Sequence, residues 1–231
     1  MHLWRVPYSK NGHLTAKAAP GTHEAVESVL KDAGVEKNAD ILELASGTGY
    51  FLSRLNDLGY SNLTSVERDM STYQYSEICP LRLDLNKPFS DKVGKKFDLI
   101  IAVEIIEHLN NPRIFLEEIY KSLKPGGRVI VTTPNVGFWL SRVQFLLTGY
   151  PKYFSPFDFS EQRHISPICD HHMKIALEET NFRLEKNFSA ASSWGFLIKA
   201  LTFPLSILFK MINRGSSDTE GNINLYMAIK I

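Results

Sequence analysis

Two glycines and a later carboxylate are the first residues in the chain whose types and spacing could bind a ligand. Gly47 and Gly49 follow an apolar run of strand length, and glycine lets a backbone turn sharply and approach a ligand with no Cβ in the way. Glu67 follows a second apolar run, where a carboxylate can accept hydrogen bonds from both hydroxyls of a ribose. Together these residues predict a site for a ligand that contains a nucleoside.

A strand, a turn, a helix and a second strand must position these residues. The run 41–44 has the length of a buried strand, and apolar residues recur at helical spacing from 51 to 58. The run 63–66 supplies the second strand, which places Glu67 at its tip. The free N–H groups at the start of the helix would face the same crevice as this carboxylate.

Further helices and strands alternate along the rest of the chain. A helix is expected over 22–33 with Thr22 as its cap, and Asn111 and Pro112 start another one. The remaining expected elements are a short helix over 71–78, strands over 80–85, 97–103, 128–133, 181–188 and 223–231, and helices over 138–147 and 168–179. The pattern is that of an α/β protein.

The glycine turn is compatible with two kinds of nucleoside-containing ligand. A dinucleotide site uses G-x-G-x-x-G, but Leu52 stands at the third glycine position, which disfavours a nicotinamide-dependent oxidoreductase. The segment 43–49, Glu-Leu-Ala-Ser-Gly-Thr-Gly, instead resembles motif I of the class I S-adenosylmethionine-dependent methyltransferases. Ala45 stands where the first family glycine usually lies and Ser46 where cysteine is common. Both side chains are small, so we expect the turn to survive.

Later segments resemble further motifs of the same family, in the same order. Segment 104–109 resembles the acid–His–Leu stretch after the fourth strand, and 124–127 reads Lys-Pro-Gly-Gly before a β-branched strand. Segment 132–135 is similar to the version in enzymes that methylate small hydroxyl compounds. Segment 164–167 resembles the His-x-x-Pro stretch of methyltransferases of surface-polysaccharide and lipid-linked biosynthesis. The resemblance implies a Rossmann-like, doubly wound, mostly parallel seven-stranded sheet with an antiparallel terminal hairpin and helical insertions.

The resemblance also implies roles for individual residues. Glu43 would order the turn and meet the methionine amine, Glu67 would bind the ribose, and Asp84 would read the adenine amino group, unless it only starts a turn. The whole set expected to bind S-adenosylmethionine is Glu43, Ala45, Ser46, Gly47, Gly49, Glu67, Arg68, Asp84, Leu85, Val103 and Glu104.

Histidines are the candidates for proton transfer. His164 would lie near the cofactor sulfonium and could take a proton from a hydroxyl nucleophile, or it could simply order its loop. His108 is either a structural residue that bonds nearby backbone or a proton acceptor. His171 and His172 fall inside an expected helix, and no metal-ligand spacing supports a role for them. We therefore expect no metal.

The 231 residues suit one domain, and three segments stand apart from the expected sheet. Residues 1–19 are a tail or a flap, 136–168 form a substrate-side insertion rich in aromatic residues, and 190–221 hold an apolar helical insertion and a linker. The stretch 194–212 approaches the length of a membrane span. Pro204 and two lysines break it, so a lid or a contact with a membrane surface is expected instead.

Composition and charge limit the kinds of binding partner that we expect. A formal net charge of +1 gives no basic field for nucleic acid, and the first residues lack the apolar core of a secretory signal. We expect a cytoplasmic protein, with peripheral membrane contact as an option. The function predicted is methyl transfer to a small or partly apolar acceptor, such as a sugar, a lipid-linked compound or another metabolite, through an oxygen. The alternatives are a non-catalytic cofactor-binding adaptor and the oxidoreductase.

Overall fold

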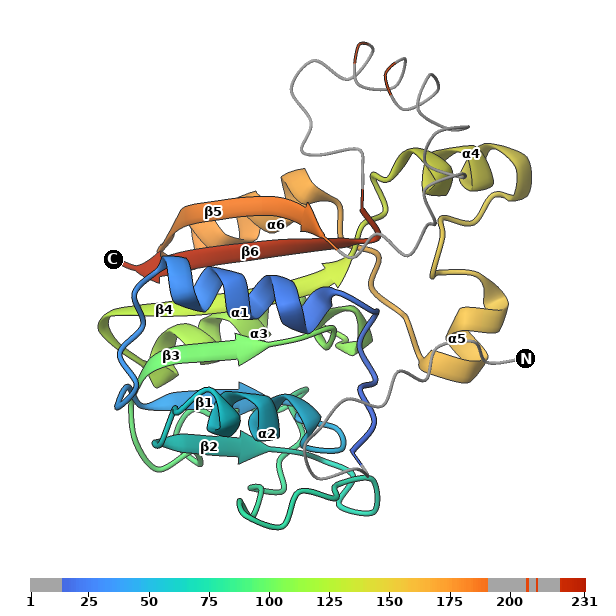
Figure 1. The fold of residues 1–231 in the computed structure, drawn as a ribbon. Helices are drawn as coiled ribbons and strands as arrows, with labels where there is room; N and C mark the ends of the chain where they lie inside the picture. Colours follow the sequence, from blue (N-terminus) through green and yellow to red (C-terminus); the bar gives the residue numbers. More distant parts are fainter. Residues whose placement is uncertain (1–13, 191–206, 208–210, 212–220) are drawn as a thin grey trace.

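The computed structural model describes residues 14–190, 207, 211 and 221–231, and a six-stranded sheet forms their centre (Figure 1). The sheet order is β2-β1-β3-β4-β6-β5. The strands β1, β2, β3 and β4 are parallel, and β6 pairs antiparallel with both β4 and β5. Their bounds are β1 Ile41–Leu44, β2 Leu63–Val66, β3 Phe97–Ala102, β4 Leu123–Pro134, β5 Phe182–Ala190 and β6 Ile223–Lys230. The predicted Rossmann-like sheet with an antiparallel terminal hairpin is confirmed.

Helices cover both faces of this sheet, which makes three layers. Figure 1 shows α1 (Thr22–Asp32) and α2 (Tyr50–Asp57) in front of it and α3 (Pro112–Ser122) and α6 (Asp170–Glu179) behind it. Alternate residues of the central strands point to opposite faces. In β3, Leu99 and Ile101 pack with α1 and α2, whereas Ile100 and Ala102 pack with α3 and α6. Both faces of the central strands are therefore buried.

Segment 80–85, one of the seven predicted strands, is absent from the sheet. Only an isolated bridge joins Leu81 to Val66. The segment turns away almost at once, because the Asp84 carboxylate accepts a hydrogen bond from the Asn86 N–H and the Asp84 carbonyl accepts one from Lys87. Such side-chain bonds compete with a strand ladder. The prediction of seven strands was therefore one too many for the described residues.

Two predictions about helices were wrong. Segment 71–78 is a series of turns, because Asp69 accepts hydrogen bonds from the backbone and the hydroxyl of Ser71 and its carbonyl accepts one from Thr72. Thr22 does not cap α1. Gly21 occupies the cap position and Thr22 is the first helical residue. The predicted cap of α3 is confirmed, since the Asn111 side chain accepts from the Ile114 N–H at 3.1 Å.

The substrate-side insertion contains two helices, α4 (Trp139–Thr148) and α5 (Pro156–Gln162). Both lie beyond the carboxyl ends of β3 and β4 (Figure 1). Segment 194–212 lies outside the described residues except for positions 207 and 211, so its predicted role as a lid or as a contact with a membrane surface stays a prediction. Across the residues that the structure describes, every helix is too short or too polar to cross a bilayer.

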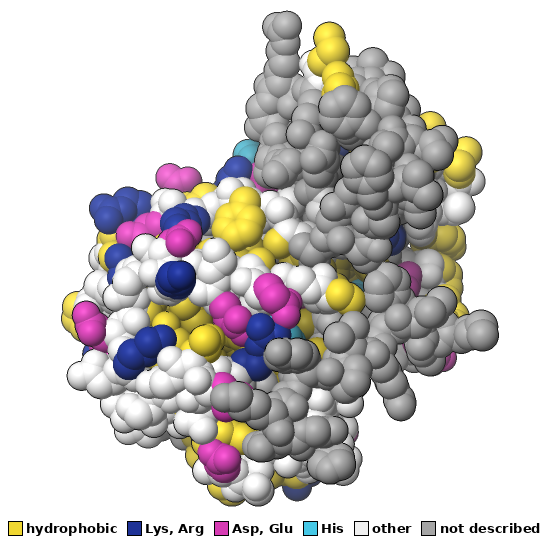
Figure 2. Space-filling view, in the orientation of Figure 1, with side chains coloured by type: hydrophobic (Ala, Val, Ile, Leu, Met, Phe, Trp, Pro, Cys, Tyr) yellow, Lys and Arg dark blue, Asp and Glu magenta, His cyan; other side chains and the backbone are white. Residues whose placement is uncertain are grey.

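Charges of both signs alternate on the face that carries α1 and α2. Figure 2 shows basic and acidic side chains interspersed over its described part. Arg54 on α2, for example, pairs with Glu24 and Glu27 on α1. These two ion pairs join neighbouring helices and involve no ligand.

A buried carboxylate on α3 holds the loop that precedes β3. Glu118 accepts hydrogen bonds from the backbone N–H groups of Phe89 at 2.7 Å and Ser90 at 2.9 Å, and from Lys121 at 2.9 Å. Burial opposes ionisation of Glu118, but these donors outweigh it and lower its pKa to about 2. The ionised group therefore stabilises the fold above its unfolded pKa, and this stabilisation is lost as the pH falls towards 2.

Glu118→Gln is expected to lower the free energy of unfolding at pH 7 by about 2 kcal/mol, because a charge-assisted acceptor is replaced by an amide. The wild type should lose stability between pH 5 and pH 2, and the variant should lose less over the same range. Urea titrations at pH 7 and pH 3 measure both quantities. Glu117→Gln, on the exposed side of α3, is the matched control and should leave the pH dependence unchanged.

Candidate functional site

A cavity of about 900 Å³ opens at the carboxyl ends of β1, β2 and β3, the edge where ligands bind in sheets of this kind. Its lining includes every residue of the predicted cofactor set except Gly49, and both candidate histidines. Lys17 and Ala18 also line it, so the described part of the segment 1–19 runs along the pocket. The structure thus brings together residues from six separate parts of the chain.

The turn after β1 is built from left-handed backbone conformations. Gly47 has φ 57° and Gly49 has φ 82°, which glycine adopts without strain. Ala45 also has a positive φ, 58°, at the position where the family usually has glycine. A left-handed conformation costs an alanine roughly 1–2 kcal/mol, so the turn is retained at a cost in folding stability. The hydroxyls of Ser46 and Ser65 join it to β2 at 2.8 Å.

Glu67 closes the same turn from the end of β2. One carboxylate oxygen accepts from the Gly47 N–H at 2.8 Å and the other from the Asp69 N–H at 2.8 Å. A carboxylate offers about four acceptor sites, so each oxygen keeps one for a ligand. The arrangement fixes the direction of the side chain and leaves it able to accept two hydroxyl groups.

Glu43 on β1 is a second buried carboxylate beneath the turn. It is 3% exposed, and its Oε2 has no hydrogen-bond partner among the described residues. Burial raises the pKa of Glu43 to about 8, and the nearby charge of Glu67 adds to the effect. A cationic group in the pocket would offset this unfavourable burial of charge.

Glu104, which follows β3, ties the segment before α1 to the site. Its carboxylate accepts from the Ala19 N–H at 2.9 Å and from the Thr22 hydroxyl at 2.9 Å. This bond explains why Thr22 does not act as a helix cap. Burial raises the pKa of Glu104 to about 7. The residue has φ 45°, so the chain turns sharply at the end of the strand.

The two predicted histidines both line the pocket and contact each other. The rings of His108 and His164 are 4.7 Å apart at an interplanar angle of 79°. His164 Nδ1 lies 2.7 Å from the carbonyl oxygen of Tyr153. Because a carbonyl can only accept, Nδ1 carries the proton and Nε2 keeps its lone pair. Burial lowers the pKa of both imidazoles, that of His108 to about 4.

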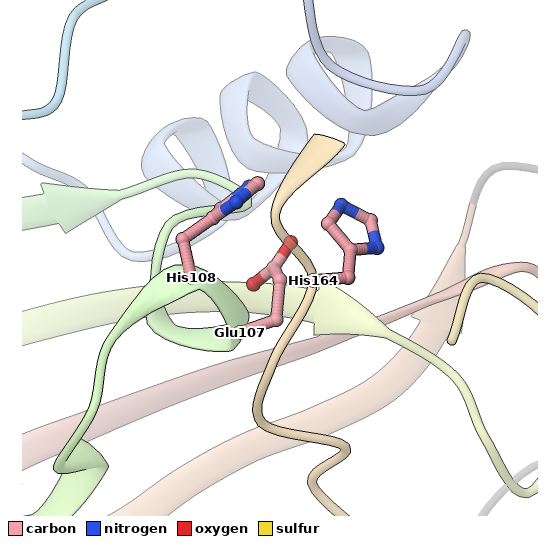
Figure 3. A group of neighbouring side chains, drawn as sticks. All are labelled: Glu107, His108 and His164. Carbon is pink, nitrogen blue, oxygen red and sulfur yellow. The ribbon is translucent and has the colours of Figure 1, made fainter. Parts of the chain in front are cut away.

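Glu107 is the residue that the sequence analysis missed. It belongs to the short 3-10 helix η1 (Ile106–His108), and it is fully buried. Neither carboxylate oxygen has a hydrogen-bond partner among the described residues. Burial raises the pKa of Glu107 well above its usual range, and the charge of Glu104 adds to this. One potential ligand atom from each of Glu107, His108 and His164 lies within 4.8 Å of the others (Figure 3). The only sequence signal was the pairing of Glu107 with His108 directly after a strand.

Comparison with known proteins agrees with this geometry. A family model described as "Methyltransferase domain" matches residues 13–187. The mitochondrial ubiquinone biosynthesis O-methyltransferase of Rattus norvegicus is 29% identical over 110 residues, which cover 41% of this chain but only 30% of the rat protein. The ubiquinone biosynthesis O-methyltransferase of Rickettsia typhi is 23% identical over 224 residues, covering 90% of this chain and 82% of that protein.

The fold likeness extends to a solved methyltransferase. Magnesium protoporphyrin IX methyltransferase from Synechocystis, with bound S-adenosylhomocysteine, gives a TM-score of 0.61 at 11% identity and covers 91% of this chain and 82% of that one. The chain belongs to the methyltransferase domain family, whose model spans most of its length. This confirms the predicted class, a methyltransferase that depends on S-adenosylmethionine, and its cofactor.

The residues present fit that cofactor. The cavity lies near the upper end of the 300–1,000 Å³ typical of small-molecule sites, so it has room for a nucleoside and an acceptor together. Glu67 keeps acceptor capacity for two hydroxyls, and one buried oxygen of Glu43 has no partner among the described residues. A ribose and a cationic amine are the groups that these two carboxylates would satisfy.

Proposed function

We propose that this protein transfers a methyl group from S-adenosylmethionine to a hydroxyl oxygen of a small, partly apolar metabolite. The observation that carries the proposal is that one cavity is lined by two kinds of residue. Glu67 and Asp84 supply polar groups suited to a nucleoside, and His108 and His164 supply imidazoles suited to a hydroxyl acceptor. The names of the two curated relatives, both O-methyltransferases, support oxygen as the accepting atom.

Each part of the cofactor has its own residues for binding. Glu67 and Arg68 bind the ribose, Asp84 and Leu85 the adenine, and the turn from Glu43 to Gly49 the methionine portion. Val103 and Glu104 lie beside the methionine portion from the end of β3. The bond from Glu104 to Ala19 and Thr22 holds the segment before α1 over this part of the cavity and restricts the entry of water.

S-adenosylmethionine supplies a methyl group activated by its sulfonium: an oxygen nucleophile bonds to the methyl carbon, the C–S bond breaks, and S-adenosylhomocysteine leaves with the electron pair. The protein's contribution is mainly to hold the nucleophile in line with that carbon. His164 presents the unprotonated Nε2 to the pocket, where it can accept the hydrogen of a substrate hydroxyl. Phe159 and Ile165, which also line the cavity, provide apolar surface for the rest of the acceptor.

The test uses purified protein, S-adenosylmethionine labelled in the methyl group, and matched acceptors. The acceptors are catechol, a catechol with a long alkyl chain, a methyl hexoside and aniline. They test, in turn, a phenolic oxygen, the contribution of an apolar tail, a sugar oxygen and a nitrogen as the accepting group. We expect label on an oxygen, with the alkyl catechol as the better of the two catechols. Transfer only to aniline would contradict the accepting atom. Tight binding of S-adenosylhomocysteine with no transfer to any acceptor would favour the non-catalytic adaptor.

A further inference from the structure

We infer that Glu107, His108 and His164 bind one divalent transition-metal ion, of the type of Zn²⁺ or Mn²⁺, at this pocket. One potential ligand atom from each side chain lies within 4.8 Å of the other two. Figure 3 shows the carboxylate of Glu107 between the two imidazole rings. Two ligands come from η1 and the third from the segment between α5 and α6, so a bound ion would join the core of the sheet to the substrate-side insertion.

The state of Glu107 is the first argument for an ion. The residue is completely buried, and both oxygens lack a hydrogen-bond partner among the described residues. Leaving a buried polar group unsatisfied costs roughly 1–3 kcal/mol, and buried charges in proteins are usually paired or coordinate metals. Glu104, three residues away, adds a second acidic group to the same end of β3. A cation between the histidines and Glu107 would satisfy this carboxylate.

The orientation of His164 is the second argument. Its Nδ1–H donates to the Tyr153 carbonyl at 2.7 Å. Histidines that ligate metals almost always donate their other ring N–H to a carbonyl or carboxylate, which fixes the tautomer and the ring direction. The bond to Tyr153 therefore prepares Nε2 of His164 as a ligand. Phe154 packs against the same ring at 5.5 Å and limits its rotation.

The ligand types indicate which ions would bind. Two imidazoles with one carboxylate suit Zn²⁺, Mn²⁺ or Fe²⁺ better than Mg²⁺ or Ca²⁺, which prefer oxygen ligands alone. Three protein ligands leave a coordination position open, as in catalytic rather than structural sites. An ion held at about 2.1 Å places its ligand atoms about 3.4 Å apart, so small side-chain rotations must draw the three groups together from their present spacing.

The open position gives the ion a role in the proposed methyl transfer, and this part of the inference rests on that function. A hydroxyl oxygen of the acceptor would bind the ion, which lowers the pKa of the hydroxyl. The O–H bond then breaks, the proton passes to water, and the electron pair stays on the oxygen that attacks the methyl carbon. Without the ion, Nε2 of His164 can accept the hydrogen of the hydroxyl directly. With the ion bound, His164 instead positions the oxygen through the ion and does not itself take the proton.

Binding of the ion is tested without any acceptor. Protein stripped with a chelator is titrated with ZnCl₂ by calorimetry, and with MnCl₂ by electron paramagnetic resonance. We expect one ion per chain, and at least about a 100-fold loss of affinity in Glu107→Gln and in His164→Ala. His172→Ala is the matched control, because His171 and His172 form an exposed neighbouring pair that could bind an ion adventitiously. Titration with S-adenosylhomocysteine shows whether each variant retains the folded cofactor site.

The outcomes separate this inference from the proposed function. No ion bound by the wild type, or an affinity that depends on His172 and not on His164, would overturn the metal site and leave Glu107 as a protonated buried acid. Methyl transfer that persists unchanged in chelator would overturn the role of the ion but not the reaction. Ion binding that requires Glu107 and His164, with no methyl transfer to any oxygen, would establish the site and contradict the proposed function.

Discussion

Replacing Glu67 with alanine is expected to weaken the binding of S-adenosylhomocysteine by at least about 100-fold. Two effects combine. The carboxylate is the group placed to accept both ribose hydroxyls. Each hydrogen bond to a charged group contributes roughly 1.5–3 kcal/mol. The same carboxylate holds the Gly47 N–H at 2.8 Å and the Asp69 N–H at 2.8 Å, so its loss also releases the turn that receives the methionine portion.

Calorimetric titration of the wild type and the variant measures this effect. Glu67→Gln keeps one acceptor oxygen and should fall between the two, whereas Asp57→Asn, an exposed carboxylate at the end of α2, should bind like the wild type. NADH serves as the competing nucleoside, and we expect no binding of it. Affinity that is indifferent to Glu67 would contradict the placement of the ribose, and tight binding of NADH would return the oxidoreductase to consideration.

The strands of the sheet could be predicted because their residues obey simple rules. The apolar runs at β1 and β3 have the length and composition of strands buried on both faces, and the structure buries them there. Segment 80–85 shows the limit of this reasoning. It contains alternating leucines, but a strand also needs a neighbour with free ladder groups, and the hydrogen bonds around Asp84 end the extended segment first.

The pocket could be predicted in the same way wherever its residues lie at the ends of strands. Glu67 and Glu104 follow apolar runs and Glu43 lies near the end of one, and parallel strands bring their carboxyl ends to one edge. What the sequence could not predict is contact across long separations. Thr22 has the type and place of a helix cap, but its hydroxyl instead bonds Glu104, 82 positions away. The choice between these partners depends on where α1 packs.

The cluster of Glu107, His108 and His164 also depends on contacts between residues far apart in the sequence. His108 follows β3, and His164 follows the inserted helix α5, so only the packing of the insertion against η1 brings the two rings within 4.7 Å. Backbone bonds make this contact. The Glu107 carbonyl accepts from the N–H groups of Ile165 at 3.0 Å and Ser166 at 2.9 Å. The expectation of no metal rested on sequence spacing alone, which does not reflect these bonds.

Gly49→Ala is expected to lower the free energy of unfolding by about 3–4 kcal/mol and to weaken cofactor binding. A Cβ at this position would lie 2.4 Å from the Cβ of Tyr75. That atom is fixed to the backbone, so no change of side-chain rotamer relieves the overlap and the loop itself must move. Overpacking of this kind costs about 1–3 kcal/mol, and the left-handed φ of 82° adds about 1–2 kcal/mol for alanine.

Gly34→Ala separates these two contributions. Gly34 also has a positive φ, 62°, but no atom of the described part of the chain lies within 4 Å of the Cβ that would be added there. Its substitution should therefore cost only the backbone strain, about 1 kcal/mol, and should leave the affinity for S-adenosylhomocysteine unchanged. Chemical denaturation of both variants gives the difference in stability, and calorimetry gives the affinities.

The loss of affinity expected for Gly49→Ala follows from a backbone contact. Because the Gln74 N–H donates to the Thr48 carbonyl at 3.1 Å, displacement of the loop at Tyr75 also moves the turn after β1. Equal losses of stability in the two variants would show that the loop yields freely and that the close approach at Gly49 does not hold the turn in place.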